Sequence, residues 1–491
     1  MKAMDRRKFL LTATATLPTL NLFSQATTTP PLKLHPETPG PHVPENFIGL
    51  SYEIQQLSDP TFFSIENAGL IEQFRALTPH GVLRLGGNTS DYGFWKPTPT
   101  SVAPPRAKRE NKIGDPTPDL SYAVTPEAIH NLRAFLDATG WTCLYGINLG
   151  TNIPSLAADE ALYVSTTLGP KLEYFQIGNE ADRFGSTIRD PKTWSADAFL
   201  DEWLTFAHAI LARVPNARFG MPDIASNAAW FTTIGDRLAT NPIREHIACL
   251  SHHYYIGGPP SNPAMTIEKI LSPNPIVTRD AGLVSTAAAK LHTAYRMTEG
   301  NTCYRGGKPG VSDVFAASLW AADYLLQLAS LGYAGVNLHG GEAKFVANSL
   351  GGTLPGDELV LAQHGNPASH PHPYYTPIAH IGDRYIAEPV NLGMRFAGFF
   401  AGATMIPIDF NPGQANATAY AAVLPTGQRM VAIINKDATQ PVHINLAAFS
   451  LAHTLSAPSL DSTDVHLSEP RNNREVSTIP PSTAVLLYAA R

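Results

Sequence analysis

The sequence predicts an α/β fold, a (β/α)8 TIM barrel followed by a C-terminal β-sandwich domain. Three observations lead to this prediction: short strands and amphipathic helices alternate regularly, the pattern changes to strands alone near the C-terminus, and the chain is long. It has 491 residues, whereas a barrel of this class takes about 250, so we expect a second, smaller domain. The 44% of hydrophobic residues and 15% of charged residues are typical of a packed globular protein.

The barrel is predicted from eight short runs rich in β-branched and aromatic residues, bounded by Gly, Pro, Asn or Asp. They are Asn46–Ile54, Gly81–Asn88, Trp141–Gly150, Glu173–Glu180, Arg218–Ala225, Ile247–Tyr255, Thr293–Gly300 and Tyr333–Gly341. Amphipathic segments follow four of them, each preceded by a capping Thr61, Thr125, Ser195 or Ser312: Phe62–Leu77, Pro126–Thr139, Ala196–Arg213 and Asp313–Leu331. A doubly wound sheet is the alternative, but the first strand lacks its Gly-rich phosphate turn.

The second domain is predicted from the strands that follow an eighth helix at Pro389–Phe400. These strands are Thr418–Leu424, Arg429–Asn435, Val442–Leu446 and Thr483–Tyr488. We therefore expect a barrel over residues 46–400 and a β-sandwich over 401–491, with residues 27–45 completing the sandwich. Long loops at 89–124 and 342–385 should border the active site, because they follow strand ends.

The first 26 residues have the order of a secretory signal. Arg6-Arg7-Lys8 precedes an apolar stretch from Leu11 to Phe23, and small residues follow. The paired arginines indicate the twin-arginine export route, while a short apolar helix with chance arginines is the alternative. No later stretch has the roughly 20 apolar residues of a membrane span. We expect a periplasmic or secreted protein.

Charge and cysteine content exclude several classes of function. Residues 1–26 carry four basic residues and one acid, so their removal shifts the formal charge from −6 to about −9. An acidic chain is a poor partner for nucleic acid. Three widely spaced cysteines predict neither a disulfide scaffold nor a cysteine-bound metal. We expect no metal and no cofactor, because His252 and His253 face opposite sides of a strand and the remaining histidines, His364, His370, His372 and His380, fall in a Pro-rich loop.

Two glutamates carry the predicted chemistry. Glu180 ends the fourth predicted strand and Glu299 ends the seventh, on the catalytic face of a barrel. Glycosidic cleavage with retention explains such a pair, since one carboxylic acid protonates the leaving oxygen while the other carboxylate attacks the anomeric carbon. Unrelated salt bridges are the alternative. Asn179, beside Glu180, could donate a hydrogen bond to the sugar 2-hydroxyl or merely close a turn.

These residues resemble the clan of barrel hydrolases that carry Asn-Glu at strand four and Glu at strand seven. Within the clan, the chain is similar to glycoside hydrolase family 79, the heparanase and β-glucuronidase family. The similarity covers Gly49–Glu53, Leu83–Asn88, Gln176–Glu180, and Glu299 with Tyr304, Gly306 and Gly307, and extends over nearly the whole mature chain. It implies Glu180 as acid/base, Glu299 as nucleophile, and β-linked glucuronic acid on a carbohydrate as substrate.

The resemblance also implies a binding role for several neighbours of the pair. Tyr304 and backbone amides near Gly306 and Gly307 would hold the sugar carboxylate, and Glu53 would bind sugar hydroxyls. Consecutive amides in a glycine turn form an anion-binding nest, and Lys308 adds positive charge beside it. A flexible loop facing water is the alternative for the turn, and a salt bridge at the edge of the core is the alternative for Glu53.

Two further side chains are expected to support the nucleophile. The resemblance implies that Tyr255 hydrogen-bonds Glu299, with Tyr254 one register step away. Arg84 could hold Glu299 in its ionised form or make an ordinary barrel salt bridge. A basic loop over residues 96–112 could attract anionic sugars, although a solvated charge run is the alternative.

The sequence thus predicts an exo-acting, retaining β-glucuronidase. A neutral-sugar hydrolase of the same clan, such as an arabinofuranosidase or xylosidase, is the nearest alternative. A secreted glycan-binding protein on an inactive barrel is the other.

Overall fold

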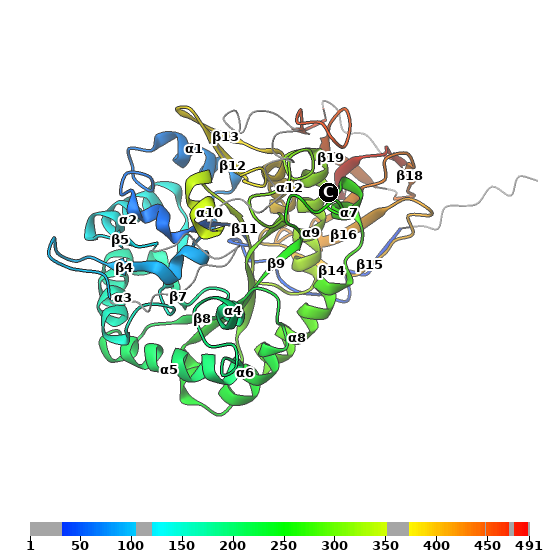
Figure 1. Cartoon of the computed structure of the whole chain (residues 1–491). Helices are drawn as coiled ribbons and strands as arrows, with labels where there is room; N and C mark the ends of the chain where they lie inside the picture. The colour runs from blue at the N-terminus through cyan, green and yellow to red at the C-terminus, as the bar shows by residue number, and fades with distance from the viewer. Residues whose placement is uncertain (1–31, 105–119, 351–372, 447, 471–475, 490–491) are drawn as a thin grey trace, which may run out of the picture.

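A computed structural model describes residues 32–104, 120–350, 373–446, 448–470 and 476–489 (Figure 1). Residues 1–26, for which we predict an export signal, lie outside the described residues. So do Arg106, Lys108, Arg109 and Lys112 of the basic loop and three of the four loop histidines, His364, His370 and His372.

Eight parallel strands close into a barrel, which confirms the predicted fold class. Each strand overlaps one of the predicted runs: β2 (Ile48–Glu53), β3 (Val82–Gly86), β6 (Thr142–Ile147), β7 (Leu172–Ile177), β8 (Phe219–Ile224), β9 (Ile247–Gly257), β10 (Ala294–Cys303) and β11 (Val336–Gly340). Every strand pairs with the next, and β11 pairs with β2. The carboxyl ends of all eight strands therefore meet at one mouth.

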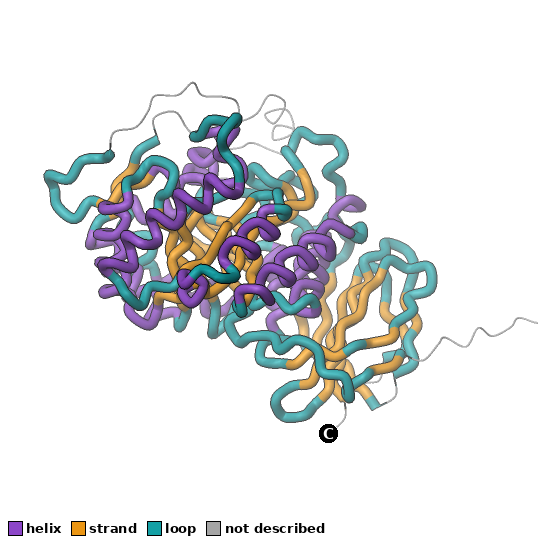
Figure 2. The backbone as a smooth tube through the Cα atoms, turned by 90° about the horizontal axis from the view of Figure 1, so that it is seen from below, coloured by secondary structure: helices purple, strands orange, loops and turns teal. Residues whose placement is uncertain are grey.

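Helices surround the barrel on the outside (Figure 2). The larger ones are α1 (Ala68–Leu77), α2 (Pro126–Thr139), α3 (Pro154–Leu168), α5 (Ala196–Arg213), α6 (Trp230–Leu238), α8 (Pro275–Leu291), α9 (Phe315–Ser330) and α12 (Pro389–Gly398). Shorter helices lie in the loops: α4 (Phe184–Thr187), α7 (Ile267–Leu271) and α10 (Ala343–Leu350). Helix α9 is buried along almost its whole length, because it lies between the barrel and the C-terminal sheet.

Two of the four predicted helix starts are right and two are wrong. Helices α2 and α5 begin after Thr125 and Ser195, whose side chains accept a backbone N–H of the first turn. Helix α1 begins after Asn67 instead of Thr61, because the Thr61 side chain is bonded to Asp59. Helix α9 begins after Val314, because the hydroxyl of Ser312 is used within the preceding loop.

The C-terminal part contains a six-stranded antiparallel sheet: β14 (Thr404–Ile406), β16 (Ala417–Val423), β17 (Arg429–Asn435), β22 (Thr483–Ala489), β19 (Phe449–Ser456) and β20 (His466–Ser468). Its two faces are both apolar. Along β17, Met430 and Ala432 pack on the barrel side, whereas Val431 and Ile433 join a separate core. Alternating burial of this kind is what period-two side-chain placement produces.

Two small sheets cover the outer face of this sheet. They are formed by β1 (Lys33–Leu34) with β15 (Ile408–Asp409) and by β18 (Val442–His443) with β21 (Thr478–Ile479). Leu32 belongs to the same outer core as Ile479. The segment before the barrel thus packs with the C-terminal strands.

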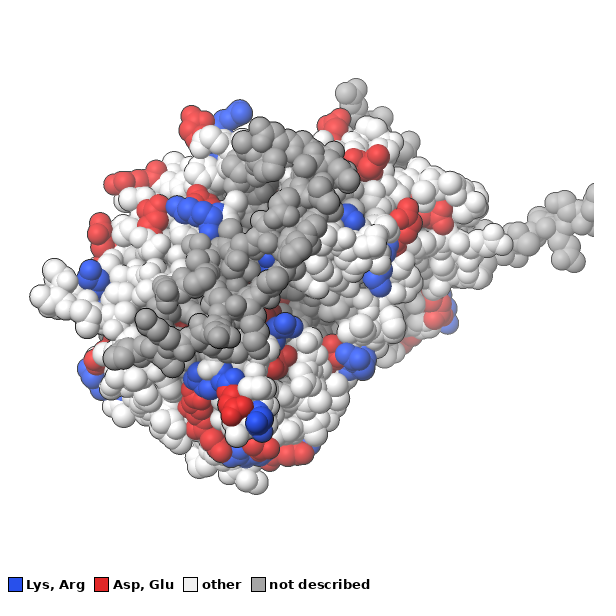
Figure 3. All heavy atoms as spheres, in the orientation of Figure 1, with Lys and Arg blue, Asp and Glu red and all other residues white. Residues whose placement is uncertain are grey.

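Charged side chains of both signs lie intermingled on the face that Figure 3 draws. Cys143, Cys249 and Cys303 are buried and form no disulfide. No helix within the described part of the chain combines the length and the apolar character that crossing a membrane requires.

Candidate active site

Glu180 and Glu299 meet at the mouth of the barrel, on the inner side of the strands. One carboxylate oxygen of each lies within 4.8 Å of the other. Such a short separation is that of a retaining pair, because the carboxyl groups of an inverting pair stand about 6.5–9.5 Å apart. The two glutamates are positioned differently from the prediction: Glu180 lies beyond the end of β7, and Glu299 lies inside β10, which continues to Cys303.

A β-bulge directs Glu299 into the mouth. The ladder between β9 and β10 shifts register between Met297 and Glu299, and such bulges re-aim side chains beside active sites. As a result, Thr298 and Glu299 both reach the polar network, with the Thr298 hydroxyl donating to Asp223. Sequence periodicity alone would place these two neighbours on opposite faces.

The backbone at Glu180 is held in a conformation that a non-glycine residue seldom adopts. Its φ is 49°, and its N–H donates to the carbonyl of Asp223 over 2.8 Å. Asp223, at the end of β8, also has a positive φ, of 56°. A left-handed conformation costs about 1–2 kcal/mol in an L-residue, and such strain concentrates at functional sites.

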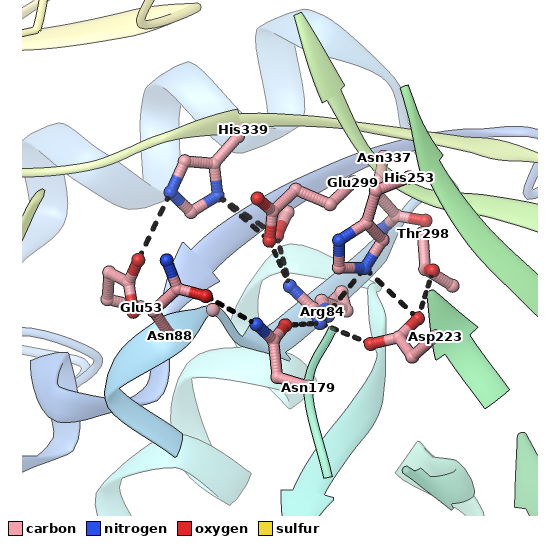
Figure 4. A network of polar contacts seen from close by, with 12 residues as sticks. Glu53, Arg84, Asn88, Asn179, Asp223, His253, Thr298, Glu299, Asn337 and His339 are labelled. Carbon is pink, nitrogen blue, oxygen red and sulfur yellow. Dashed lines mark hydrogen bonds and ion pairs between the residues drawn. The ribbon is translucent and has the colours of Figure 1, made fainter. Parts of the chain in front are cut away.

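Arg84 connects the groups at the mouth (Figure 4). Its side chain is 1% exposed and donates to Glu299 Oε2 over 2.5 Å, to Asn179 Oδ1 over 2.6 Å, and to Asp223. The hydroxyl of Tyr255 donates to the other oxygen of Glu299 over 2.9 Å. The two side chains predicted to support the nucleophile therefore both contact it.

The pKa values of the two glutamates are displaced in opposite directions. Burial alone would raise the pKa of Glu299, but the positive charges of His339, His253 and Arg84 outweigh it and lower the pKa to about 2. For Glu180, burial raises the pKa and the charge of Glu299 adds to the effect, although a hydrogen bond from His253 opposes it. The pKa of Glu180 is thus pushed above that of Glu299, and such a separation between two carboxyl groups suits the different roles that glycosidic cleavage needs.

His253 bridges Glu180 and Asp223. Its Nδ1 lies 3.1 Å from Glu180 Oε1, and its Nε2 lies 3.2 Å from Asp223 Oδ1. Burial by itself would lower the pKa of His253, but Asp223 and Glu299 raise it to about 10. Arg84 and His253 hold the pKa of Asp223 well below its usual range despite burial. Sequence reasoning missed Asp223 and weighed His253 only as a metal ligand.

His252 faces away from the mouth, as the strand alternation predicts. Its Nε2 lies 2.8 Å from the hydroxyl of Tyr333, and burial lowers its pKa to about 3. The two adjacent histidines therefore serve different environments, one neutral in the barrel wall and one charged in the site.

The carboxylate of Glu53, at the end of β2, is held by hydrogen bonds from Thr89. Its Oε2 accepts the N–H of Thr89 over 3.0 Å and the hydroxyl of Thr89 over 2.7 Å. Its Oε1 lies 3.5 Å from Nε2 of His339, whose Nδ1 is 3.8 Å from Glu299 Oε2. Gly87 is required here, because a Cβ at this position would lie 2.2 Å from Glu53 Oε2.

Asn179 is held in a single orientation. Its Oδ1 accepts from Arg84, its Nδ2 donates to Asn88 Oδ1 over 3.0 Å, and its backbone N–H donates to Asp91 Oδ2 over 3.1 Å. Asp91 also accepts the N–H groups of Leu149 and Gly150, and burial raises its pKa to about 6. Sequence reasoning missed Asp91, which lies in the loop after β3.

In the glycine turn beyond Glu299, two of the backbone N–H groups expected to form an anion-binding nest are hydrogen-bonded within the protein. The N–H of Gly307 donates to the carbonyl of Cys303 over 3.1 Å, and the N–H of Lys308 donates to Ser312 Oγ over 2.9 Å. The Gly307 amide therefore closes the turn itself, and the expectation that backbone amides near Gly306 and Gly307 hold the sugar carboxylate stays a prediction. Gly306 and Gly307 both have positive φ values, 88° and 85°.

The side chains around the turn lie at the edge of the site. The ring of Tyr304 is 40% exposed and lies 6.4 Å from the ring of Tyr255, and its hydroxyl donates to Gly258 O over 2.8 Å. Lys308 Nζ lies 3.2 Å from the carbonyl of Asn262. Tyr375, which sequence reasoning missed, packs between Tyr255 and His339, with ring separations of 6.3 and 5.8 Å.

The same cluster also bears on metal binding. Glu180, His253 and Glu299 each place one potential ligand atom within 4.8 Å of the others. However, the guanidinium of Arg84 already contacts Glu299, and a protonated His253 offers no lone pair at either ring nitrogen. The positive charges of Arg84 and His253 would repel a metal cation at this position, so the cluster fits proton transfer better than metal binding.

The fold defined by the barrel and the attached sheet is that of (β/α)8 glycosidases, as comparison with solved structures shows. A 4-O-α-L-rhamnosyl-β-D-glucuronidase from Fusarium oxysporum superposes with a TM-score of 0.65 at 16% identity, over 92% of this chain and 98% of that one. A GH51 arabinofuranosidase from Xanthomonas axonopodis pv. citri gives the same TM-score and identity, over 93% and 99%.

Sequence comparison finds two relatives that are both named β-glucuronidase. The chain is 27% identical to a β-glucuronidase of Aspergillus niger over 312 residues, 58% of this chain and 55% of that protein. It is 27% identical to a β-glucuronidase of Neurospora crassa over 296 residues, 53% of this chain and 50% of that protein. The matched region thus spans about half the length of these relatives. No protein-family model matches the chain.

Proposed function

We propose that the chain is a retaining glycoside hydrolase in which Glu299 is the nucleophile and Glu180 the acid/base. The observation that carries the proposal is the close carboxylate pair with oppositely displaced pKa values. Glu180 gives its proton to the glycosidic oxygen as Glu299 attacks the anomeric carbon, which forms a glycosyl ester and releases the aglycone. Glu180 then takes a proton from water, which attacks the same carbon and restores free Glu299.

The neighbouring charges support both half-reactions. When Glu299 becomes a neutral ester, Arg84 keeps a partner in Asp223, so no unpaired guanidinium is left buried. In the second half-reaction the sugar leaves an ionised Glu299, and the same Arg84 and the Tyr255 hydroxyl stabilise it. His253 moves no proton in this scheme, because Asp223 keeps it charged.

We further propose that the substrate is a terminal β-D-glucuronide, and that the chain is a member of glycoside hydrolase family 79. The support is the similarity to two β-glucuronidases together with cationic Lys308 beside the turn. With the Gly307 amide engaged, Tyr304 and Lys308 are the side chains left to meet the sugar carboxylate. Asn179 and Glu53 would bind the sugar hydroxyls.

A set of nitrophenyl glycosides tests the substrate. We expect turnover of the β-D-glucuronide and far slower turnover of the β-D-glucoside, β-D-xyloside and α-L-arabinofuranoside. A Lys308→Met variant should raise KM for the glucuronide only, whereas the exposed Lys269→Met on α7 serves as the matched control. Equal rates on glucoside and glucuronide would exclude the uronide assignment, and fast cleavage of the arabinofuranoside would favour the neutral-sugar alternative.

We also propose that residues 1–26 direct export by the twin-arginine route. A fusion of these residues to a reporter that is active only outside the cytoplasm tests the proposal. Replacement of both Arg6 and Arg7 by Lys should abolish exported reporter activity, because the route requires the arginine pair. Unchanged export of the double variant would exclude this route.

A further inference from the structure

A second cavity lies outside the barrel wall, where the barrel meets the C-terminal sheet. It has a volume of about 630 Å³, within the range of about 300–1,000 Å³ of small-molecule sites, which often occur at domain interfaces. Residues of β9, α8 and α9 form its barrel side, and residues of β16 and the end of β17 form the opposite side. Figure 1 shows α7, α9 and β16 grouped beside the barrel in this region.

Strand β9 separates this cavity from the candidate active site. Tyr255 points into the barrel and donates to Glu299. Tyr254, its neighbour, points outward, lines the cavity and is hydrogen-bonded to Asn274. A ligand in the cavity would therefore contact neither Glu180 nor Glu299.

The barrel side of the cavity is built from stacked aromatic rings. Trp320 and Tyr324 of α9 stack with centroids 5.1 Å apart and an interplanar angle of 12°. Tyr254 stacks on Tyr324 at 5.4 Å. The rings fix one another, so this apolar wall is preorganised. The three rings are only 3–8% exposed because they cover one another, so they contribute a rigid apolar wall, and tyrosine and tryptophan also provide polar edges.

The polar part of the cavity lies where α9 meets the opposite side, and its two charged groups, Asp323 of α9 and Lys436, balance each other. Asp323 Oδ1 accepts the hydroxyl of Thr418 over 2.6 Å and that of Tyr420 over 2.7 Å, and Asp323 Oδ2 accepts from Lys436. The Lys436 side chain is only 3% exposed. A buried ion pair is weak support for stability. Its evident effect here is to hold two hydroxyl groups and a neutralised charge pair against the cavity.

The rim adds uncharged donors and acceptors. Gln327 is half-buried and Gln414 is exposed, and both line the cavity. A side-chain amide both donates and accepts, as a sugar hydroxyl does. The combination of stacked rings, hydroxyls, amides and balanced charge disfavours an ionic ligand and fits an uncharged, hydroxyl-rich one.

We propose that this cavity is a second carbohydrate-binding site, which takes a neutral sugar residue and is independent of catalysis. It would anchor a neutral part of a glycan while another part occupies the barrel mouth. The proposal goes beyond the glycosidase function, because binding here needs neither catalytic glutamate.

The test measures binding of xylotriose, cellotriose and galactotriose to the Glu299→Gln protein by titration calorimetry, so that hydrolysis cannot interfere. Thr278→Trp on α8 places a large side chain at the cavity, which Thr278 lines from an exposed position. Thr286→Trp, exposed farther along the same helix and away from the cavity, is the matched control. Gln327→Leu removes a polar group without filling the space.

We expect at least one trisaccharide to bind, with more than tenfold loss of affinity in Thr278→Trp, a smaller loss in Gln327→Leu and no change in Thr286→Trp. Binding that survives Thr278→Trp, or the absence of binding by all three probes, would overturn the proposal. A Glu180→Gln change added to Glu299→Gln should leave the affinity unaltered, so loss of hydrolysis and loss of this site are distinguishable.

Discussion

Arg84 and the carboxylates around it define the chemistry at the scale of single residues. A buried guanidinium that contacts Glu299, Asn179 and Asp223 at once uses its planar fork, which a lysine cannot reproduce. We therefore expect the ionised state of Glu299, the proposed nucleophile, to depend on the planar shape of the Arg84 guanidinium as well as on its positive charge.

Arg84→Lys should lower kcat/KM by about 100-fold or more, the scale on which preorganised electrostatic contacts act. The pKa of Glu299 should also rise toward its ordinary value, because Arg84 is one of the charges that lower it. The acid limb of the pH–rate profile then moves to higher pH. Arg133→Lys on α2 is the control, and an unmoved acid limb would count against this role for Arg84.

His253 affects the pKa of Glu180, the proposed acid/base, as well as the pKa of Glu299, the proposed nucleophile. Because the contact with His253 lowers the pKa of Glu180, His253→Gln should raise that pKa and move the alkaline limb of kcat/KM to higher pH. In the native protein, the alkaline limb should lie above 4.5, the ordinary value for Glu, because burial raises the pKa of Glu180. A shift of the limb to lower pH in the variant would contradict this sign.

Sequence reasoning identified site residues where a charged side chain stands among apolar neighbours or belongs to a recognisable motif. Glu180 and Glu299 are acids at the ends of apolar predicted strands, Arg84 is a charged residue within another predicted strand, and Tyr255 was implied by the family resemblance. Asp223 and His339 were missed, because a polar residue at a strand end looks alike whether it faces the barrel or a helix, and Asp91 was missed because it lies in the loop after β3. The closed Gly307 amide was also unpredictable, since the partner carbonyl depends on how the turn folds.

At the scale of elements, α3 and β6 enclose a buried acid outside the site. Glu160 on α3 is 5% exposed and accepts the hydroxyl of Tyr145 on β6 over 2.8 Å. Burial raises its pKa to about 7 from the usual 4.5 of a glutamate. A group whose folded pKa is raised in this way favours the folded state when neutral, so stability is lost as pH rises from about 4.5 through 7.

Glu160→Gln removes this pH dependence and retains the acceptor for Tyr145. The variant should therefore have a higher Tm than the native protein above pH 7 and a similar Tm near pH 5, measured by thermal unfolding. Glu127→Gln, at the start of α2, is the control. A Tm difference that does not grow with pH would show that Glu160 does not titrate across this range.

The elements were predicted best where burial alone decides them. All eight barrel strands are apolar enough to be recognised in the sequence, and the bounds of α2 and α5 match the predicted bounds to the residue. The ends of β9 and β10 were missed, because the ladder continues by pairing Asn301 with Tyr255 and Cys303 with Gly257. This pairing holds polar residues inside a strand, and no local pattern signals it.

At the scale of the whole molecule, the C-terminal sheet packs on the barrel. Met430, Ala432 and Ile434 of β17 belong to the same core as the barrel helices, and α9 lies beneath them. We propose that residues 401–491, with residues 27–45, form a domain that unfolds together with the barrel.

Ala432→Asp tests that coupling, because it buries an unpaired charge in the shared core. Calorimetry should show one unfolding transition with a Tm lowered by several degrees. Ala438→Asp, at an exposed position of the same domain, should have little effect. A separate barrel transition at the native temperature would contradict the coupling.

The most direct test of the catalytic pair is covalent trapping. Incubation with 2-deoxy-2-fluoro-β-D-glucuronyl fluoride should inactivate the protein and attach one glycosyl group, because the fluorine slows hydrolysis of the ester more than its formation. Peptide mapping by mass spectrometry should then find the label on Glu299. A label on another residue, or rapid turnover of an active native enzyme with no label and an inverted product, would contradict the double-displacement account.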